Sequence, residues 1–250
     1  MLLGADVSGA NKNVAYSDYD FIIIKASEGN GYKSNALDYH LAEKTNSLYG
    51  FYHFARPDLN NTAKEEAEYF LSLVGDYAGN CIYALDWEAE ALAYNPDWAL
   101  AWLNYVYNKT GVKPMLYISA SQENTGKYNA IRDADFGLWV AHWGVKTPSV
   151  KHWPFWAMWQ FDNNKIDKNY FNGNETQFKK YCGSNVSHET ISPGDTVKLT
   201  SRIDYNGHLN DSWVLNATFF VKSINGRRVV VGPKDGITGA WDITNILKEE

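Results

Sequence analysis

The sequence predicts an α/β domain with a parallel sheet, followed by a small all-β domain. Up to about residue 182, short apolar runs alternate with helical patterns in units of about 30 residues, as in proteins built from βαβ units. The segment 183–192 is polar and has no apolar periodicity, and the residues after it show only strand patterns. We therefore assign residues 1–182 to the first domain, 183–192 to a linker and 193–250 to the second domain.

Seven apolar runs of the first domain are predicted to be strands. A parallel sheet of this kind is either open and doubly wound or closed into a barrel. The segment KIDKN at 165–169 is a candidate for a short eighth strand, and eight strands favour closure. The seven longer strands are expected at residues 2–8, 21–27, 48–55, 81–88, 114–120, 136–143 and 155–161.

Two helices between these strands have clear start signals. Thr62 and Glu65 have the spacing of a capping box, and Asn95 precedes a proline at the first helical position. Gly75 and Gly111 stand where these two helices should end. After residue 136 helical patterns largely disappear while strand patterns continue.

The second domain is predicted to be a small barrel or sandwich of strands. Strand-type runs occur in DTVKLTS, SWVLNATFFVKSI and RRVVVG. Asn225-Gly226, between the last two, is the preferred sequence of a two-residue hairpin turn.

Composition excludes several classes of partner and cofactor. With a net charge of −6 and no long basic cluster, the chain is not expected to bind nucleic acid. No run reaches the length of a membrane span, and the N-terminus lacks the pattern of a signal peptide, so we expect no membrane insertion and synthesis in the cytoplasm. The two cysteines and six scattered histidines form no metal-binding pattern, so no metal or other cofactor is predicted.

Acidic side chains stand at the ends of several predicted strands. In the stretch IYALDWEAE, the acids Asp86, Glu88 and Glu90 occupy every second position, so in a strand all three would share one face. The carboxyl ends of parallel barrel strands meet at one mouth. The polar residues expected there are Asp6, Lys25, Glu28, Tyr52, His53, Asp86, Glu88, Tyr117, Gln160 and Asp167.

This set suits hydrolysis of a glycosidic bond. Carboxylates brought close together repel one another, so at least one stays protonated near neutral pH and can serve as a general acid. A second carboxylate then acts as nucleophile, stabilises the developing cation, or orients a substrate group. Aromatic residues suit sugar rings, and five tryptophans fall within residues 139–159. The motifs of serine hydrolases, P-loop proteins and zinc proteases are missing.

These segments resemble glycoside hydrolase family 25, the lysozymes found in many phage endolysins. The resemblance rests on GADVS, FIIIKASEG, YGFYHFARP, YALDWE, LYIS, LWVAHW and WQFDNNKIDKNYF, which follow one another in the family's order. It implies a flattened, TIM-like barrel of five βα units followed by three strands, (β/α)5(β)3. It also implies an N-acetylmuramidase that cleaves the β-1,4 bond between N-acetylmuramic acid and N-acetylglucosamine in bacterial peptidoglycan.

The resemblance also implies a role for each site residue. Glu88 would be the general acid, Asp86 would orient or stabilise the acetamido group of the substrate, and Asp6 and Asp167 would complete the acidic floor. Whether the reaction retains or inverts configuration stays open. The residues expected to bind the glycan strand are Lys25, Glu28, Tyr52, Tyr117, Trp159 and Gln160.

The second domain resembles a bacterial SH3-type cell-wall-binding domain, whose partner would be a wall component. A phage endolysin made in the host cytoplasm and acting on the wall after release is the leading interpretation. Two alternatives remain: a chitinase-like glycosidase, because ALDWE resembles the end of another family's motif, and a non-catalytic wall-binding protein on a degenerate barrel.

Overall fold

The computed structural model of the chain describes residues 1–41, 48–183, 191–199, 202, 204–206, 208, 210–226 and 228–249. It consists of two compact units, Met1–Ser184 and Asn185–Glu250. Most of the linker predicted at 183–192 lies outside the described residues.

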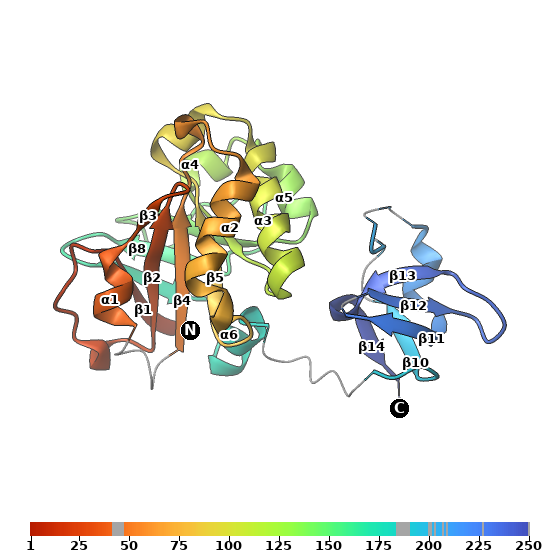
Figure 1. The fold of residues 1–250 in the computed structure, drawn as a ribbon. Helices are drawn as coiled ribbons and strands as arrows, with labels where there is room; N and C mark the ends of the chain where they lie inside the picture. The colour runs from red at the N-terminus through yellow and green to blue at the C-terminus, as the bar shows by residue number, and fades with distance from the viewer. Residues whose placement is uncertain are drawn as a thin grey trace. The chain divides into compact units, whose positions relative to one another are not determined.

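The first unit, coloured red to teal in Figure 1, contains a barrel of eight strands that closes on itself according to the strand pairing. The barrel closes because β1 pairs with both β2 and β9, so the predicted closure is confirmed and the open sheet is ruled out. A short ninth strand, β3 (Tyr32–Lys33), forms a hairpin with β2. The barrel strands are β1 (Leu2–Val7), β2 (Phe21–Glu28), β4 (Leu48–Phe54), β5 (Ile82–Asp86), β6 (Met115–Ser119), β7 (Gly137–Ala141), β8 (Met158–Asp162) and β9 (Asp167–Phe171).

One strand departs from the predicted parallel sheet. Strand β9 runs antiparallel to both β8 and β1, whereas every other neighbouring pair in the barrel is parallel. Only residues 163–166 join β8 to β9, and a connection this short permits a hairpin but not a crossover. The reversal places Asp167, the first residue of β9, opposite Asp6 near the end of β1.

The predicted helix signals are confirmed. Thr62 and Glu65 form the reciprocal bonds of a capping box at the start of α2 (Ala63–Val74). Asn95 accepts a hydrogen bond from the Asp97 amide at the start of α3 (Pro96–Thr110), and Gly111 ends that helix with a left-handed φ of 78°. The shorter helices are α1 (Asn35–His40), α4 (Ala120–Glu123), α5 (Asn129–Asp133) and α6 (Glu175–Tyr181). Within residues 137–171, three strands follow one another without a helix, as predicted.

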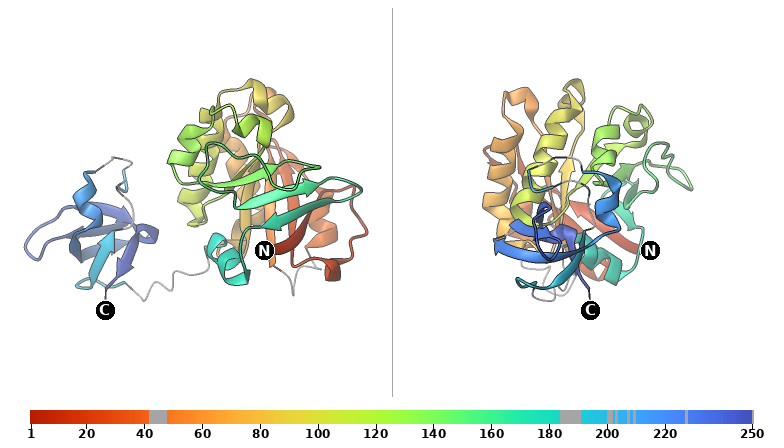
Figure 2. Two further views of the ribbon diagram at one scale, coloured as in Figure 1. Left: turned by 180° about the vertical axis from the view of Figure 1, so that it is seen from behind. Right: turned by 90° about the vertical axis from the view of Figure 1, so that its right-hand side faces the viewer.

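The barrel unit has two apolar cores, because strand side chains alternate between its two faces. The outer core lies between the sheet and the helices and includes Phe70 and Trp102. The inner core fills the barrel itself and includes Phe21, Phe171 and Phe178. Phe178 of α6 packs against the other two rings with centroids 5.3 and 5.1 Å away, and α6 lies beside the N-terminal end of β1 (Figure 2). One end of the barrel is therefore sealed, which leaves the opposite rim for polar groups.

The second unit is a five-stranded antiparallel sheet with a core of its own. Its core includes Val197, Phe219, Val229 and Trp241. The predicted hairpin joins β11 to β12, where Asn225 pairs with Arg228 and Gly226 has a φ of 57°. The strand predicted from Ser212 begins later, because Ser212–Leu215 form a short 3-10 helix. In sheet order the strands are β13 (Gly239–Asp242), β12 (Arg228–Gly232), β11 (Thr218–Asn225), β10 (Thr196–Leu199) and β14 (Ile246–Lys248).

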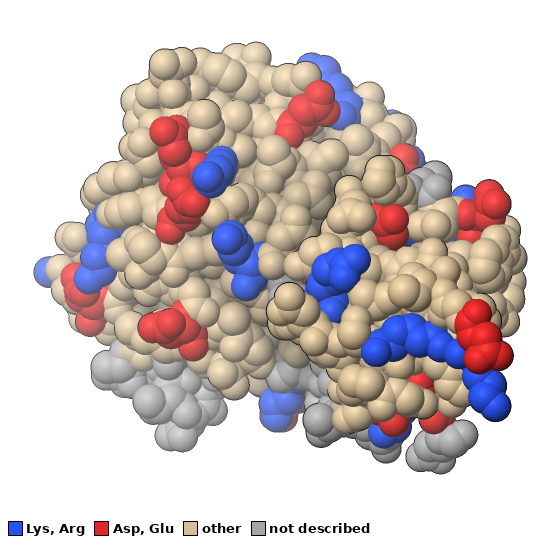
Figure 3. All heavy atoms as spheres, turned by 45° about the vertical axis from the view of Figure 1, so that its right-hand side comes forward, with Lys and Arg blue, Asp and Glu red and all other residues tan. Residues whose placement is uncertain are grey.

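Charge on the face drawn in Figure 3 is mixed, with acidic and basic side chains interspersed among wide uncharged areas. Among the described residues, no helix is both long enough and apolar enough to cross a bilayer.

Candidate active site

The acidic stretch that ends β5 turns two of its three carboxyl groups toward the barrel mouth. Asp86 ends the strand, Trp87 packs in the outer core, and Glu88 follows with extended backbone, so the two acids share the inner side. Ala89 then adopts a φ of 49°, which turns the chain into a 3-10 helix at Ala89–Ala93. Glu90 lies in that helix and not in the strand, so the strand alternation does not extend to it.

Asp6 is held at the same mouth by two amide side chains. Its Oδ2 accepts hydrogen bonds from Gln160 Nε2 at 2.9 Å and Asn169 Nδ2 at 2.7 Å, and its side chain is buried. Asp167 lies directly across from it in the β1–β9 register. Carboxyl groups from the two ends of the domain are thus brought side by side.

Aromatic donors fix the orientation of both amides. Tyr117 OH and Trp143 Nε1 donate to Gln160 Oε1 at 2.9 and 3.0 Å, and Trp139 Nε1 donates to Asn169 Oδ1 at 2.8 Å. With their oxygens engaged in this way, both amides must present NH2 groups to Asp6. Asn169 was missed by sequence reasoning, although its position two residues after Asp167 in one strand was a signal that it faces inward.

Lys25 and Glu28 both stand at the end of β2, three residues apart. In a regular strand an odd spacing would put them on opposite faces. A register shift between Lys25 and Ser27, where one extra residue enters the pairing with β4, changes the alternation. Lys25 Nζ therefore donates to Glu28 Oε2 at 2.8 Å.

Burial and mutual repulsion favour protonated carboxyl groups at this mouth. Burial, followed by repulsion from Asp167, raises the pKa of Asp6 to about 7. Burial raises the pKa of Asp86 well above its ordinary value, and the neighbouring Glu88 adds to the rise. Burial also raises the pKa of Glu88, with Lys25 opposing and Asp167 reinforcing the change. The pKa of Asp167 is raised mainly by burial and then by Asp162. At least one proton is consequently retained near neutral pH.

Two tyrosines complete the inner wall beside these acids. Tyr52 and Tyr117 are largely buried in the inner core. Burial raises the pKa of both phenols, and the surrounding Asp6, Asp86, Glu88 and Asp167 raise it further. Both remain neutral hydrogen-bonding groups at the mouth.

Trp159, which is predicted to bind substrate, does not face the mouth. It adjoins Gln160 in β8, and neighbouring strand residues face opposite sides, so the inward Gln160 turns Trp159 outward. There it packs in the outer core and donates its Nε1 hydrogen to the His142 carbonyl at 2.9 Å. Trp153 and Trp156 also belong to the outer layer. Of the tryptophan cluster, only Trp139 and the half-exposed Trp143 join the site network.

His53 and Glu28, two further polar residues expected at the mouth, are held in contacts within the protein. His53 is fully buried on the helix side of β4, where its ring stacks on Trp102. Glu28 has both carboxylate oxygens engaged, by Lys25 and by Arg56. Within the described part of the chain, no group of three or more His, Cys, Asp or Glu side chains is placed to hold a metal ion.

Residues 5–170 match the sequence profile of the glycosyl hydrolases family 25. The chain belongs to this family. Lysozyme M1 of Streptomyces globisporus is 30% identical over 205 residues, covering 68% of this chain and 67% of the relative. The N,O-diacetylmuramidase of Arthroderma benhamiae is also 30% identical over 205 residues, covering 72% of this chain and 86% of its own. Among solved structures, the CTP1L endolysin is similar with a TM-score of 0.57 and 29% identity, covering 73% of this chain and 70% of that one.

Membership of family 25 makes the chain a glycoside hydrolase, so the prediction of an enzyme is confirmed. It decides against both the chitinase-like alternative and the non-catalytic barrel. The family match contains every mouth acid, from Asp6 to Asp167.

Proposed function

We propose that this family 25 hydrolase is a peptidoglycan muramidase, which cleaves the β-1,4 bond between N-acetylmuramic acid and N-acetylglucosamine with Glu88 as general acid. The observation that carries the proposal is the gathering of Asp6, Asp86, Glu88 and Asp167 at one rim with raised pKa values. The names of the two curated relatives, a lysozyme and a diacetylmuramidase, support the choice of substrate.

Glu88 is favoured as the proton donor by its accessibility. Asp86 and Glu88 interact so closely that a proton retained by the pair belongs to both. Asp86 is only 7% exposed, whereas Glu88 is partly exposed and can meet a glycosidic oxygen at the mouth. Asp86 and Glu88 therefore share the proton, and Glu88 donates it to the glycosidic oxygen.

Asp86 is suited to hold the acetamido group of the substrate. Its Oδ1 is buried and has no hydrogen-bond partner among the described residues. A buried acceptor without a partner is costly, by about 1–3 kcal/mol, and binds a donor strongly when one arrives. The N–H of an acetamido group is such a donor. Asp6 and Asp167 supply the remaining carboxyl groups of the mouth. Polar contacts to the glycan come from Lys25, Tyr52, Tyr117 and Gln160.

The released sugar end tests the bond assignment. Purified bacterial cell walls are digested, the new reducing ends are labelled by borohydride, and the labelled sugars are identified after acid hydrolysis. We expect reduced muramic acid to accumulate as the walls clear. Reduced glucosamine in its place would assign the enzyme to the other glycosidic bond of the polymer.

The biological setting that we propose is phage lysis. The similarity to the CTP1L endolysin supports it. In that role the enzyme would be made in the host cytoplasm and would reach the wall after release. Its partner would be peptidoglycan alone, with no nucleic acid.

We propose that the second unit is an SH3-like domain that binds the cell wall. Its five antiparallel strands enclose a separate core, as expected of a module that folds independently of the barrel. A linked binding module keeps the enzyme near its polymer and raises the effective concentration of substrate.

Removal of the second unit is expected to separate binding from catalysis. A chain ending at residue 183 should sediment with cell walls at least about tenfold less, because it loses avidity, while its turnover of short soluble glycan fragments stays unchanged. Co-sedimentation and fragment kinetics measure the two effects. Equal sedimentation of the short and full chains would contradict the wall-binding role.

A further inference from the structure

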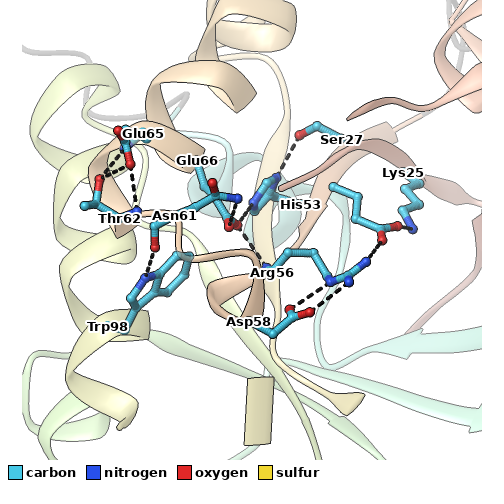
Figure 4. A network of polar contacts seen from close by, with 11 residues as sticks. Lys25, Ser27, His53, Arg56, Asp58, Asn61, Thr62, Glu65, Glu66 and Trp98 are labelled. Carbon is cyan, nitrogen blue, oxygen red and sulfur yellow. Dashed lines mark hydrogen bonds and ion pairs between the residues drawn. The ribbon is translucent and has the colours of Figure 1, made fainter. Parts of the chain in front are cut away.

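A chain of ion pairs leads from the mouth to Arg56, a residue that the sequence did not single out. The Arg56 guanidinium binds Asp58 through two parallel contacts of 2.8 Å each (Figure 4). Its Nη1 donates to Glu28 Oε1 at 2.6 Å. A planar guanidinium can make all three bonds at once, because its donors have a fixed fork geometry. Arg56 thereby locks the position of the Glu28 carboxylate.

Glu28 in turn holds the ammonium group of Lys25. Its second oxygen, Oε2, accepts from Lys25 Nζ at 2.8 Å, and that Nζ also lies 4.6 Å from the centre of the Phe54 ring. The side chain of Lys25 is only 15% exposed. Although burial opposes it, the bonds from Lys25 and Arg56 hold the pKa of Glu28 below its ordinary value. Glu28 is thus a fixed anion between two cations.

The backbone of Arg56 is anchored separately to helix α2. Its amide donates to Glu66 Oε2 at 3.0 Å, and the same oxygen accepts from His53 Nε2 at 2.7 Å. Ser27 Oγ lies 2.8 Å from His53 Nδ1, and Asn61 Nδ2 donates to the other Glu66 oxygen at 3.1 Å (Figure 4). Ser27, His53 and Glu66 are fully buried. A buried hydrogen-bond network therefore fixes the backbone from which the Arg56 side chain extends.

From this arrangement we infer that Arg56 is a positioning residue, which through Glu28 fixes the Lys25 ammonium beside Asp86 and Glu88 and balances the charge of the mouth. The inference rests on the proposed function, because it concerns the acids that would transfer the proton. Lys25, Glu28, Arg56 and Asp58 together carry no net charge, so loss of Arg56 alone leaves an excess of negative charge next to the acids.

The direction of the effect follows from the charges around the pair. Lys25 lowers the pKa of both Asp86 and Glu88, while Glu28 raises that of Asp86. Without the positive charge of Arg56, the negative charges of Glu28 and Asp58 are no longer balanced. The pKa values of Asp86 and Glu88 therefore rise further. The charged and titratable groups that face the pair are Lys25 and Glu28 of β2, Tyr52 of β4, Tyr117 of β6, Asp6 of β1 and Asp167 of β9.

Three variants of the full chain test the inference. Arg56→Gln removes the charge and the fork, and Arg56→Lys keeps the charge but not the fork. Arg132→Gln is the matched control, since Arg132 is 27% exposed against 24% for Arg56 and pairs with Asp133 at 2.7 Å. We expect Arg56→Gln to shift the pH profile of kcat upward by about half a unit and to lower kcat several-fold. Arg56→Lys should keep the profile and lower kcat only, and Arg132→Gln should keep the profile.

A measurement without substrate separates this inference from the proposed function. The 13C chemical shifts of the side-chain carboxyl carbons report the titration of Asp86 and Glu88 in wild type and in Arg56→Gln. We expect the midpoints of both titration curves to move upward by about half a pH unit in the variant. Curves that coincide with the wild type, or an equal shift in Arg132→Gln, would overturn the role of Arg56. Wild type that titrates as expected but releases no muramic acid ends would overturn the proposed function alone.

Discussion

Replacing Glu88 with Gln is expected to lower kcat on cell walls by about 10²- to 10⁴-fold. Gln has nearly the same shape as Glu but no proton to give, and a positioned general acid contributes about this much to hydrolysis. The loss should appear in kcat, because the proton is transferred in the transition state. Turbidity loss of purified walls and turnover of soluble fragments measure it.

Glu90 offers a matched control within the same stretch. Glu90→Gln is the same chemical change two residues along the chain, but Glu90 is exposed and lies in the 3-10 helix beyond the turn at Ala89. It should keep wild-type activity to within about twofold, as expected for an exposed side chain away from the chemistry. Both variants should sediment with walls like the wild type. Clearing by Glu88→Gln at the wild-type rate would remove Glu88 from the mechanism.

Replacing Asp6 with Asn is expected to stabilise the barrel unit at neutral pH. The rise of the Asp6 pKa from 3.8 to about 7 corresponds to at most about 4 kcal/mol of unfavourable free energy for the ionised group in the folded state. Asn is uncharged, and its oxygen can still accept from Gln160 and Asn169. We expect a gain of about 1–3 kcal/mol in the free energy of unfolding at pH 7, with reduced activity.

The sign of the pH dependence follows from proton binding. Between pH 4 and 7 the folded state binds more protons at Asp6 than the unfolded chain does, because the pKa is higher in the folded state. The favourable contribution is therefore fully present below about pH 4 and is lost as pH rises through about 7. In Asp6→Asn this loss should be smaller, so the two proteins should differ little at pH 4 and most at pH 7.

Urea unfolding of the full chain, followed through the transition of the barrel unit at both pH values, measures this difference. Asp38→Asn is the control, since Asp38 forms an exposed ion pair with Lys33 and should change stability by no more than about 0.5 kcal/mol at either pH. A variant Asp6→Asn that is less stable than wild type at pH 7 would contradict the proposed cost of an ionised Asp6 in the folded state.

Local patterns in the sequence were sufficient for the elements and for the gathering of the acids. Apolar runs and helix caps depend on neighbours a few residues apart, so the eight strands and the starts of α2 and α3 could be predicted. The carboxyl ends of parallel strands converge whatever their exact pairing, so Asp6, Asp86 and Glu88 could be expected together. Their placement required no knowledge of register.

The tertiary structure alone decided which neighbouring side chains share the inside of the barrel. Trp159 and Gln160 are adjacent, and Lys25 and Glu28 are three apart, so strand alternation allows neither pair a common face. The register shift in β2 brings the second pair together, whereas β8 is regular at Trp159 and turns it away. The pairing of β9 with β1, the hydrogen bond of Asn169 to Asp6 and the ion pair of Arg56 with Glu28 likewise join segments far apart in the sequence. Sequence periodicity predicts that side chains alternate between two faces. Contacts between distant segments decide which residues face the inside of the barrel.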